Sequence, residues 1–244
     1  MGKLPDYGID APTIVRNNAV GGILAWIASA ALFIIFRRSN SDFAQSILVN
    51  GFILGTLLLA VAAFMFWSSK VGKFWIRDKL LSLISWRGDE QVLDIGCGRG
   101  LALIGAAHRL TTGHATGIDL WSAKDLSNNS TQAVTENAKT EKVAAKITIK
   151  TGDARALPFP DDSFDVVVSM TAIHNINGRA ERRRAIEEAV RVLKANGTLA
   201  IFDIFYAGTY VRWLRELGMK DVSRSRVILL WMIPGRLIKA RKGA

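Results

Sequence analysis

Residues 92–100 combine an acidic side chain with three glycines directly after an apolar run. They read Val-Leu-Asp-Ile-Gly-Cys-Gly-Arg-Gly, so Asp94 stands two residues before the first glycine. Glycine lets a backbone turn sharply and approach a ligand where a Cβ atom would clash. A loop that binds pyrophosphate usually spaces its glycines G-x-G-x-x-G, and an acid beside it would repel the ligand. The G-x-G-x-G spacing behind an aspartate therefore predicts a site for a cationic nucleoside.

This motif resembles the first motif, D-x-G-x-G-x-G, of the class I S-adenosylmethionine (SAM) dependent methyltransferases. The resemblance covers roughly residues 70 to 242 and implies SAM as the cofactor, with S-adenosylhomocysteine as the product. It also implies an α/β fold, a seven-stranded Rossmann-like sheet whose last strand is antiparallel. The chain departs from the family at Asn196, where a Pro-Gly pair is usual.

Acidic residues at two later strand ends extend the expected cofactor site. Asp119 ends a second strand, where a carboxylate can accept both ribose hydroxyls. The resemblance assigns Asp153 to the adenine amino group and residues 164–170 to the fourth strand. An aspartate in a loop can also serve only as a helix cap or turn residue. The expected cofactor-binding residues are Asp94, Gly96, Cys97, Gly98, Gly100, Asp119, Leu120, Trp121, Gly152, Asp153, Ala154 and Met170.

Two long uncharged stretches precede this region. Residues 19–36 contain 18 residues and residues 43–67 contain 25, with Arg37, Arg38 and Asp42 between them. As helices they would measure about 27 and 37 Å, against a hydrocarbon core of about 30 Å. We therefore expect a transmembrane hairpin within residues 19–69, although a buried helix pair or a cleaved signal peptide would also be apolar.

Charge predicts how this hairpin lies in the membrane. Basic residues precede the first stretch and follow the second, whereas the connection carries only Arg37 and Arg38. The positive-inside rule then places residues 1–18 and the methyltransferase domain, residues 70–244, on the cytoplasmic side of the inner membrane. Small residues stand four apart on both stretches, and they can pack the hairpin or pair two protomers into an oligomer. They are Gly21, Ala25 and Ser29 on the first stretch and Gly51 and Gly55 on the second.

The net charge of +11 does not by itself indicate a nucleic-acid partner. The resemblance argues against one, because the Asp/Asn-Pro-Pro-Tyr/Phe signature of base-modifying amino methyltransferases is replaced by Ser-Met-Thr-Ala at residues 169–172. Basic residues near a bilayer suit anionic lipid equally well. We also expect no metal site, because the three histidines are widely spaced and Cys97 is the only cysteine.

Three residues are candidates for the chemistry of methyl transfer. His174 follows the fourth strand, and its ordinary pKa near 6.5 suits proton removal, although it could merely cap a helix or shape the pocket. The segment before the core covers the acceptor in many class I enzymes, which makes Tyr7 and Asp10 candidate contacts in a lid. A loose tail is the alternative.

These features favour a membrane-anchored SAM-dependent methyltransferase whose acceptor is small or hydrophobic, such as an isoprenoid, a quinone or a lipid. Tethering to a bilayer would explain the hairpin. An enzyme that methylates a soluble heterocycle or thiol, with the hairpin as a mere anchor, is the first alternative. A SAM-binding membrane protein without turnover is the second.

Overall fold

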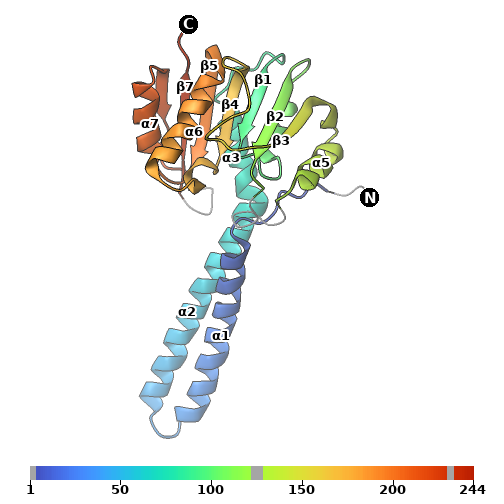
Figure 1. The fold of residues 1–244 in the computed structure, drawn as a ribbon. Helices are drawn as coiled ribbons and strands as arrows, with labels where there is room; N and C mark the ends of the chain where they lie inside the picture. The colour runs from blue at the N-terminus through green and yellow to red at the C-terminus, as the bar shows by residue number, and fades with distance from the viewer. Residues whose placement is uncertain (1–3, 122–128, 230–233) are drawn as a thin grey trace.

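An antiparallel helical hairpin projects from an α/β domain in the computed structural model, which describes residues 4–121, 129–229 and 234–244 (Figure 1). The hairpin consists of α1 (Pro12–Phe36) and α2 (Ser41–Trp67). The first helix begins seven residues before the apolar stretch, because Pro12 is suited to a first helical turn. Residues 12–18 therefore belong to the hairpin and not to the leading segment.

The second helix of the hairpin runs directly into the domain. A π-helical turn, η1 (Ser68–Gly72), joins α2 to α3 (Lys73–Leu81), so residues 41–81 form one uninterrupted helix. Ile76 and Leu80 of α3 are fully buried in the core of the domain. The hairpin is thus attached through a helix that is itself part of the core.

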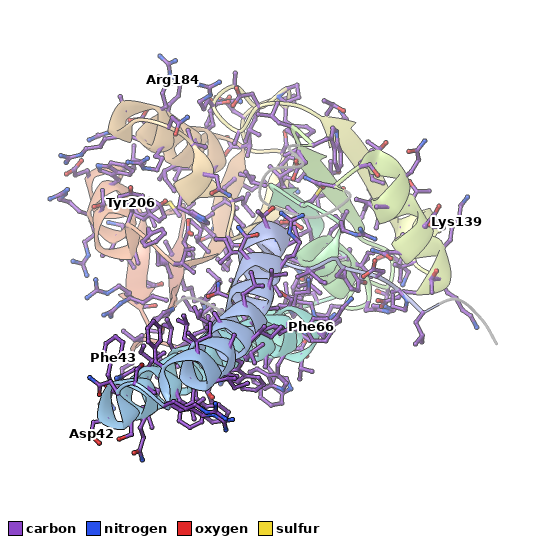
Figure 2. The ribbon with its side chains drawn as sticks, turned by 90° about the horizontal axis from the view of Figure 1, so that it is seen from below. Asp42, Phe43, Phe66, Lys139, Arg184 and Tyr206 are labelled. Atoms are coloured by element: carbon purple, nitrogen blue, oxygen red, sulfur yellow. The ribbon has the colours of Figure 1, made fainter. Side chains whose placement is uncertain are left out.

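Small residues hold the two hairpin helices close together. A Cβ atom added to Gly51 would lie 2.3 Å from the Cβ atom of Ser29, and one added to Gly55 would lie 2.3 Å from Trp26. On α1 the glycine at the crossing is Gly22, whose added Cβ would meet the Gly55 carbonyl oxygen at 2.8 Å. These residues therefore already pack against each other within one chain. Figure 2 views the hairpin from below, with Phe43 near its tip.

Replacing Gly51 with leucine should destabilise the hairpin by about 1–3 kcal/mol, because the new side chain must displace Ser29. Gly21→Leu is the matched control, since its Cβ would meet nothing nearer than Leu58 at 3.6 Å. Resistance of the full chain to unfolding by sodium dodecyl sulfate, followed by circular dichroism, measures the difference. Equal resistance of the two variants would contradict this packing.

The domain is built on a seven-stranded sheet with the order β3-β2-β1-β4-β5-β7-β6. The pairs among β1 to β5 are parallel, and β7 is antiparallel to both of its neighbours. This matches the expected sheet with its antiparallel last strand. The strands are β1 (Gln91–Ile95), β2 (His114–Asp119), β3 (Ile147–Thr151), β4 (Phe164–Met170), β5 (Leu193–Asp203), β6 (Lys220–Arg224) and β7 (Arg236–Arg241).

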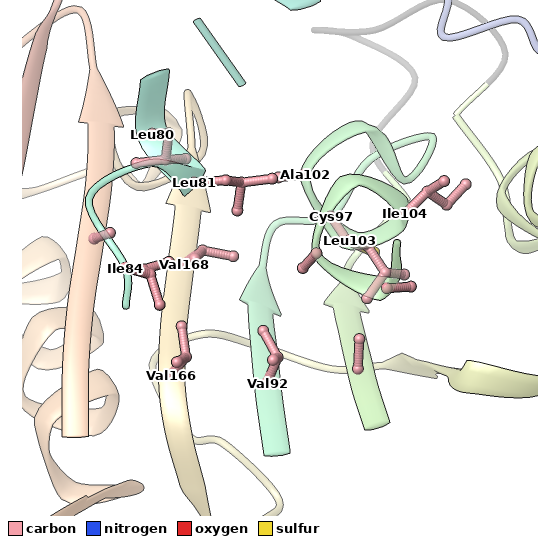
Figure 3. Packing of buried hydrophobic residues seen from close by; sticks show 14 of the residues in the cluster. Leu80, Leu81, Ile84, Val92, Cys97, Ala102, Leu103, Ile104, Val166 and Val168 are labelled. Carbon is pink, nitrogen blue, oxygen red and sulfur yellow. The ribbon is translucent and has the colours of Figure 1, made fainter. Parts of the chain in front are cut away.

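Helices cover both faces of this sheet because successive strand residues point to opposite sides. Val166 and Val168 face the cluster formed with α3 (Figure 3). Val167 between them belongs to the cluster on the other face. The first face also packs α4 (Leu101–Ala107) and α5 (Thr131–Thr140), and the second packs α6 (Arg179–Arg191) and α7 (Ala207–Glu216). The short helices are η2 (Ala144–Lys146) and η3 (Ile173–Asn175).

The parallel strands end on the side of the domain that faces the hairpin. The chain terminus that follows β7 lies at the opposite end of the molecule, so β7 runs away from the hairpin (Figure 1). Because β7 is antiparallel to β5, the parallel strands run toward the hairpin. Ligands of open α/β sheets bind at the carboxyl ends of the strands, which here form the face nearest the hairpin.

Candidate active site

A cavity of about 700 Å³ lies at the carboxyl ends of the parallel strands. Its lining comes from the turns after β1, β2, β3 and β4 and from the segment before α1. Thirteen of the fifteen residues expected to form the site line it together, namely Tyr7, Asp10, Asp94, Gly96, Cys97, Gly98, Asp119, Leu120, Gly152, Asp153, Ala154, Met170 and His174.

Gly100 and Trp121 are not among the lining residues. Gly100 has a φ of 87° and precedes α4, where an added Cβ would lie 2.9 Å from Val134, so it serves the turn and its packing. Trp121 donates its backbone N–H to Asp119 at 2.6 Å and its ring N–H to the Thr151 hydroxyl at 2.7 Å. Both residues therefore support the loops around the cavity.

Asp94 is the most unusual group in this cavity. Its side chain is 1% exposed, and neither carboxylate oxygen has a hydrogen-bond partner among the described residues. Burial raises the pKa of Asp94 to about 7, against an opposing effect of the nearby Leu103 backbone N–H and with a smaller contribution from the charge of Asp119. A buried charge without a partner is costly, so Asp94 is suited to a cationic group brought by a ligand. The ammonium of SAM fits this requirement.

The glycine turn beside Asp94 leaves no room for side chains. Gly96 has a φ of 71°, and a Cβ atom there would lie 2.2 Å from that of Ala172. Gly98 donates its backbone N–H to the Asp119 carboxylate at 2.8 Å, which ties the end of β2 to the turn after β1. Asp119 therefore helps to hold the glycine turn in place at the cavity.

Asp153 has a different environment from the other two acids. Its carboxylate accepts hydrogen bonds from the Arg155 guanidinium at 2.6 to 3.0 Å, and Arg155 also bonds Glu181 at 3.0 Å. The hydrogen bonds from Arg155 lower the pKa of Asp153. This acid stays ionised and oriented at the edge of the cavity, with its oxygens already engaged by Arg155.

The Cys97 thiol is not prepared for nucleophilic chemistry. Burial, together with the charges of Asp94 and Asp119, raises its pKa well above the ordinary value. A thiolate would be disfavoured here, so Cys97 acts as a small packing residue of the turn. Among the described residues, no cluster of three or more His, Cys, Asp or Glu side chains could hold a metal ion.

His174 forms a buried pair with Asp203. The ring Nδ1 lies 2.5 Å from one Asp203 oxygen, and the backbone N–H of His174 donates to the other at 3.1 Å. The Asp203 side chain is fully buried and also accepts a bond from the Tyr210 hydroxyl at 3.3 Å. A carboxylate on Nδ1 favours the tautomer with its proton there and the lone pair on Nε2. His174, which lines the cavity, is therefore oriented as a proton acceptor.

The segment before α1 is fixed across the cavity, and we call residues 6–11 the strap. Lys73, which is 2% exposed, donates to the carbonyl oxygens of Tyr7 and Gly8 at 2.7 and 2.8 Å. The Asp10 backbone N–H donates to the Ser69 hydroxyl at 3.0 Å, within the π-helical turn. The strap is thus docked on η1 and on the first residue of α3, and it is not a loose tail.

The strap also contacts the glycine turn. Arg99 of the glycine turn donates to the Asp6 carbonyl at 2.7 Å and to its carboxylate at 3.1 Å. Tyr7 donates its hydroxyl to Glu141, and its ring packs edge-on against Phe74. The Tyr7 hydroxyl therefore anchors the strap, whereas Asp10 remains the strap residue with a carboxylate at the cavity.

Replacing Lys73 with methionine should release the strap. Burial raises the pKa of Asp10 and lowers that of Lys73, and the two side chains lie 3.5 Å apart. Removing the lysine leaves Asp10 buried without its counter-charge, which costs about 3 kcal/mol. We expect a lower melting temperature and at least about tenfold faster hydrogen exchange in the strap, since 1.4 kcal/mol corresponds to a factor of ten.

Lys70→Met is the control for this prediction. Lys70 also contacts the strap, through an exposed pair with Asp6 at 3.2 Å. Exposed ion pairs contribute little, so its loss should change stability by less than about 1 kcal/mol. Similar exchange rates in both variants would show that Lys73 does not hold the strap.

Sequence reasoning missed three residues that organise this site: Lys73, Arg99 and Asp203. Only Asp203 carried a usable signal, because an acid at the end of the fifth strand must lie on the same sheet edge as His174. Lys73 and Arg99 gave no such signal, since their partners lie more than 60 residues away in the chain.

Comparison with known proteins agrees with this geometry. The family model described as a methyltransferase domain matches residues 93–201. This part of the chain is therefore similar to a methyltransferase domain. The matched range runs from β1 through β5 and includes Asp94, Asp119 and His174. SAM is the cofactor of this class of domain, in accord with the buried acid and the glycine turn.

Curated relatives match the same region. The chain is 31% identical over 131 residues to the 27-O-demethylrifamycin SV methyltransferase of Amycolatopsis mediterranei, covering 52% of this chain and 43% of that one. It is 29% identical over 159 residues to the 2-methyl-6-phytyl-1,4-hydroquinone methyltransferase 2 of Oryza sativa, and this match covers 58% of this chain and 42% of that one. The chain thus spans about half the length of the curated relatives it matches.

Solved structures share the fold at low sequence identity. The [4+2]-cyclase SpnF superposes with a TM-score of 0.58 at 18% identity, covering 70% of this chain and 82% of that one. YcgJ from Bacillus subtilis superposes with a TM-score of 0.54 at 16% sequence identity, and the match covers 69% of this chain and 98% of that one. One fold can host different reactions, so these similarities establish the architecture alone.

Proposed function

We propose that this chain is a membrane-anchored SAM-dependent methyltransferase that acts on a small or hydrophobic acceptor. The buried, unpartnered carboxylate of Asp94 at the glycine turn carries this proposal, because a cationic cofactor would supply its missing partner. The match of residues 93–201 to a methyltransferase domain supports the same cofactor. Asp119 would hold the ribose hydroxyls.

Anchoring is supported by length, composition and exposure of the hairpin. Each helix contains an 18-residue window of mean hydropathy 2.3 or 2.4, and only 11% of each window is buried in the protein. Large apolar side chains such as Ile27, Ile53 and Leu57 are therefore exposed along it. A lipid bilayer would cover this surface. The basic residues that flank the hairpin favour a cytoplasmic location for the domain, at the inner membrane.

Proton removal from the acceptor would be the task of His174. SAM, when bound, supplies a methyl group on a cationic sulfur that an acceptor atom can attack. Nε2 of His174 would take the proton from an acceptor hydroxyl while the oxygen forms its bond to the methyl carbon. The sulfur of bound SAM would keep the electron pair of the broken S–C bond and become neutral. Asp203 would stabilise the imidazolium that forms.

A hydrophobic acceptor is favoured by the position of the cavity. Asp10 lines the cavity and lies only two residues before the start of α1, so the site is adjacent to the base of the hairpin. Relatives include the hydroquinone methyltransferase of rice and a ubiquinone/menaquinone biosynthesis C-methyltransferase from Ruegeria, at 29% and 30% identity. Together these observations favour a quinone, isoprenoid or other lipid-like acceptor.

Radiolabelled SAM tests this proposal. The purified full chain in nanodiscs is incubated with a lipid extract and, separately, with a pool of water-soluble metabolites. Label transferred to lipid is the expected result. Label in the aqueous pool alone would assign a soluble heterocycle or thiol as the acceptor. The absence of transfer to either pool, with S-adenosylhomocysteine still bound, would identify a non-catalytic SAM-binding protein and overturn the proposal.

A further inference from the structure

Exposed apolar and basic side chains lie outside the cavity lining, at the starts of α6 and α7 and after β6. Phe205 is 48% exposed and Leu229 is 67% exposed, although each lies beside a buried strand or a bridged turn. Arg179 at the start of α6 and Arg226, which precedes Val227 in the chain, are also exposed. We call this group the rim: Phe205, Tyr206, Val227, Leu229, Arg179 and Arg226.

The rim extends from the same sheet edge as the active site. Phe205 follows β5 by two residues, and its ring lies 5.8 Å from that of His174. The bridge between Ile228 and Gly235 continues the β6–β7 pairing beyond Asp203, toward the hairpin. The rim therefore borders the cavity on the face where α1 leaves the domain. Figure 2 views that face, with Tyr206 labelled to one side of the hairpin.

The rim also carries a positive charge. Neither Arg179 nor Arg226 has a carboxylate within 4 Å among the residues that the structure describes. Arg182 lies 4.0 Å from the centre of the Tyr206 ring and adds a third cation. Tyr206 itself has a φ of 60°, a conformation that is costly for a residue with a side chain, and it stays exposed.

We propose that the rim is a second membrane-contacting surface, which rests among anionic lipid headgroups and directs the mouth of the cavity into the bilayer. Aromatic and aliphatic side chains bordered by arginines are typical of surfaces that insert at the interface. An acceptor dissolved in the bilayer would then reach His174 without crossing water. This inference rests on the proposed membrane anchor, because the hairpin sets the distance between the rim and the bilayer.

Fluorescence quenching by brominated lipids tests the rim in the full-length chain. Single cysteines are introduced by Leu229→Cys, Phe52→Cys and Lys220→Cys and labelled with bimane, and the unsubstituted chain is treated in parallel to subtract any label on the buried Cys97. Phe52 lies within the hairpin, and Lys220 is exposed where β6 begins, at the end of that strand away from the rim. Nanodiscs contain phosphatidylcholine with or without phosphatidylglycerol.

We expect strong quenching at position 52, at least about twofold more quenching at 229 than at 220, and a larger effect when phosphatidylglycerol is present. Quenching at 52 with equal values at 229 and 220 would overturn the rim but leave the anchor intact. No quenching at 52 would overturn the anchor itself. Arg179→Glu with Arg226→Glu should remove the dependence on phosphatidylglycerol, and a dependence that survives would contradict the role of the arginines.

A contact with a second copy of the chain is distinguished by stoichiometry. Nanodiscs that hold a single chain should retain the quenching at position 229 if lipid covers the rim. Loss of quenching in these discs, with position 52 unchanged, would assign the rim to a protein interface and overturn the proposal.

Discussion

Replacing Asp94 with asparagine should weaken S-adenosylhomocysteine binding by about 100-fold and, at the same time, raise the melting temperature of the ligand-free protein. The first effect follows from the loss of a buried charge opposite an ammonium, which costs about 2–5 kcal/mol. The second follows because the carboxylate oxygens have no partner among the described residues. A substitution that weakens ligand binding but stabilises the ligand-free protein is expected where the acid serves to bind the ligand.

The pH dependence of stability has a defined sign for this acid. Folding raises the pKa of Asp94 from 3.8 to about 7, so the folded state binds the extra proton between these values. The stability that this proton binding provides is fully present below about pH 4. It is lost as the pH rises through about 7, and the total loss is about 4 kcal/mol at most. The stability advantage of Asp94→Asn should therefore grow between pH 5 and pH 8.

Binding should show the opposite trend in the wild-type protein. Only the ionised carboxylate attracts the ammonium, so affinity for S-adenosylhomocysteine should increase from pH 6 to pH 8. Calorimetry and thermal unfolding at several pH values measure both trends. Asp119→Asn provides a control that alters the same cavity without removing the unpartnered buried group. Equal affinities of wild type and Asp94→Asn would eliminate Asp94 as the ammonium ligand.

Replacing His174 with glutamine should lower kcat by about 100-fold to 10,000-fold, the range contributed by a positioned general base. Cofactor affinity should change by less than about twofold, because the ring contacts Asp203 and borders the space beyond the cofactor loop. Asp203→Asn should lower kcat as well, since an amide can stabilise the wrong tautomer of the ring. The assay uses whichever acceptor pool receives label from SAM.

The pH profile of turnover separates a base from a residue that only shapes the pocket. A base gives an acidic limb in the wild-type profile that is absent in His174→Gln. A variant with reduced kcat that keeps the limb would assign His174 to positioning alone. Tyr210→Phe, which removes only the weaker 3.3 Å bond to Asp203, is the conservative control and should retain most activity.

The residues expected to bind the cofactor could be grouped from the sequence because their signals are local. The order of strand, acid and glycine turn at Asp94 depends on residues within one short segment, and Asp119 and Asp153 are placed by strand ends alone. The sheet brings these ends together whatever the details of the loops. Thirteen of fifteen expected site residues therefore line one cavity.

Contacts between distant segments could not be read in the same way. Lys73 follows the second apolar stretch, where its charge indicated only the orientation of the hairpin. In the fold, the π-helical turn places it under the strap, where its ammonium binds two carbonyl oxygens. Similarly, Gly22 and not Gly21 lies at the helix crossing, because the relative rotation of α1 and α2 is set by packing.

The helix from Ser41 to Leu81 runs without interruption from the hairpin into the α/β domain. Each residue inserted into that helix would turn the domain by about 100° and lift it by about 1.5 Å. The direction in which the active site faces around the hairpin axis therefore depends on the number of residues in this helix. Because the strap that carries Tyr7 and Asp10 is docked on this helix, a change in its length would need a matching change in α1 to keep both side chains at the cavity.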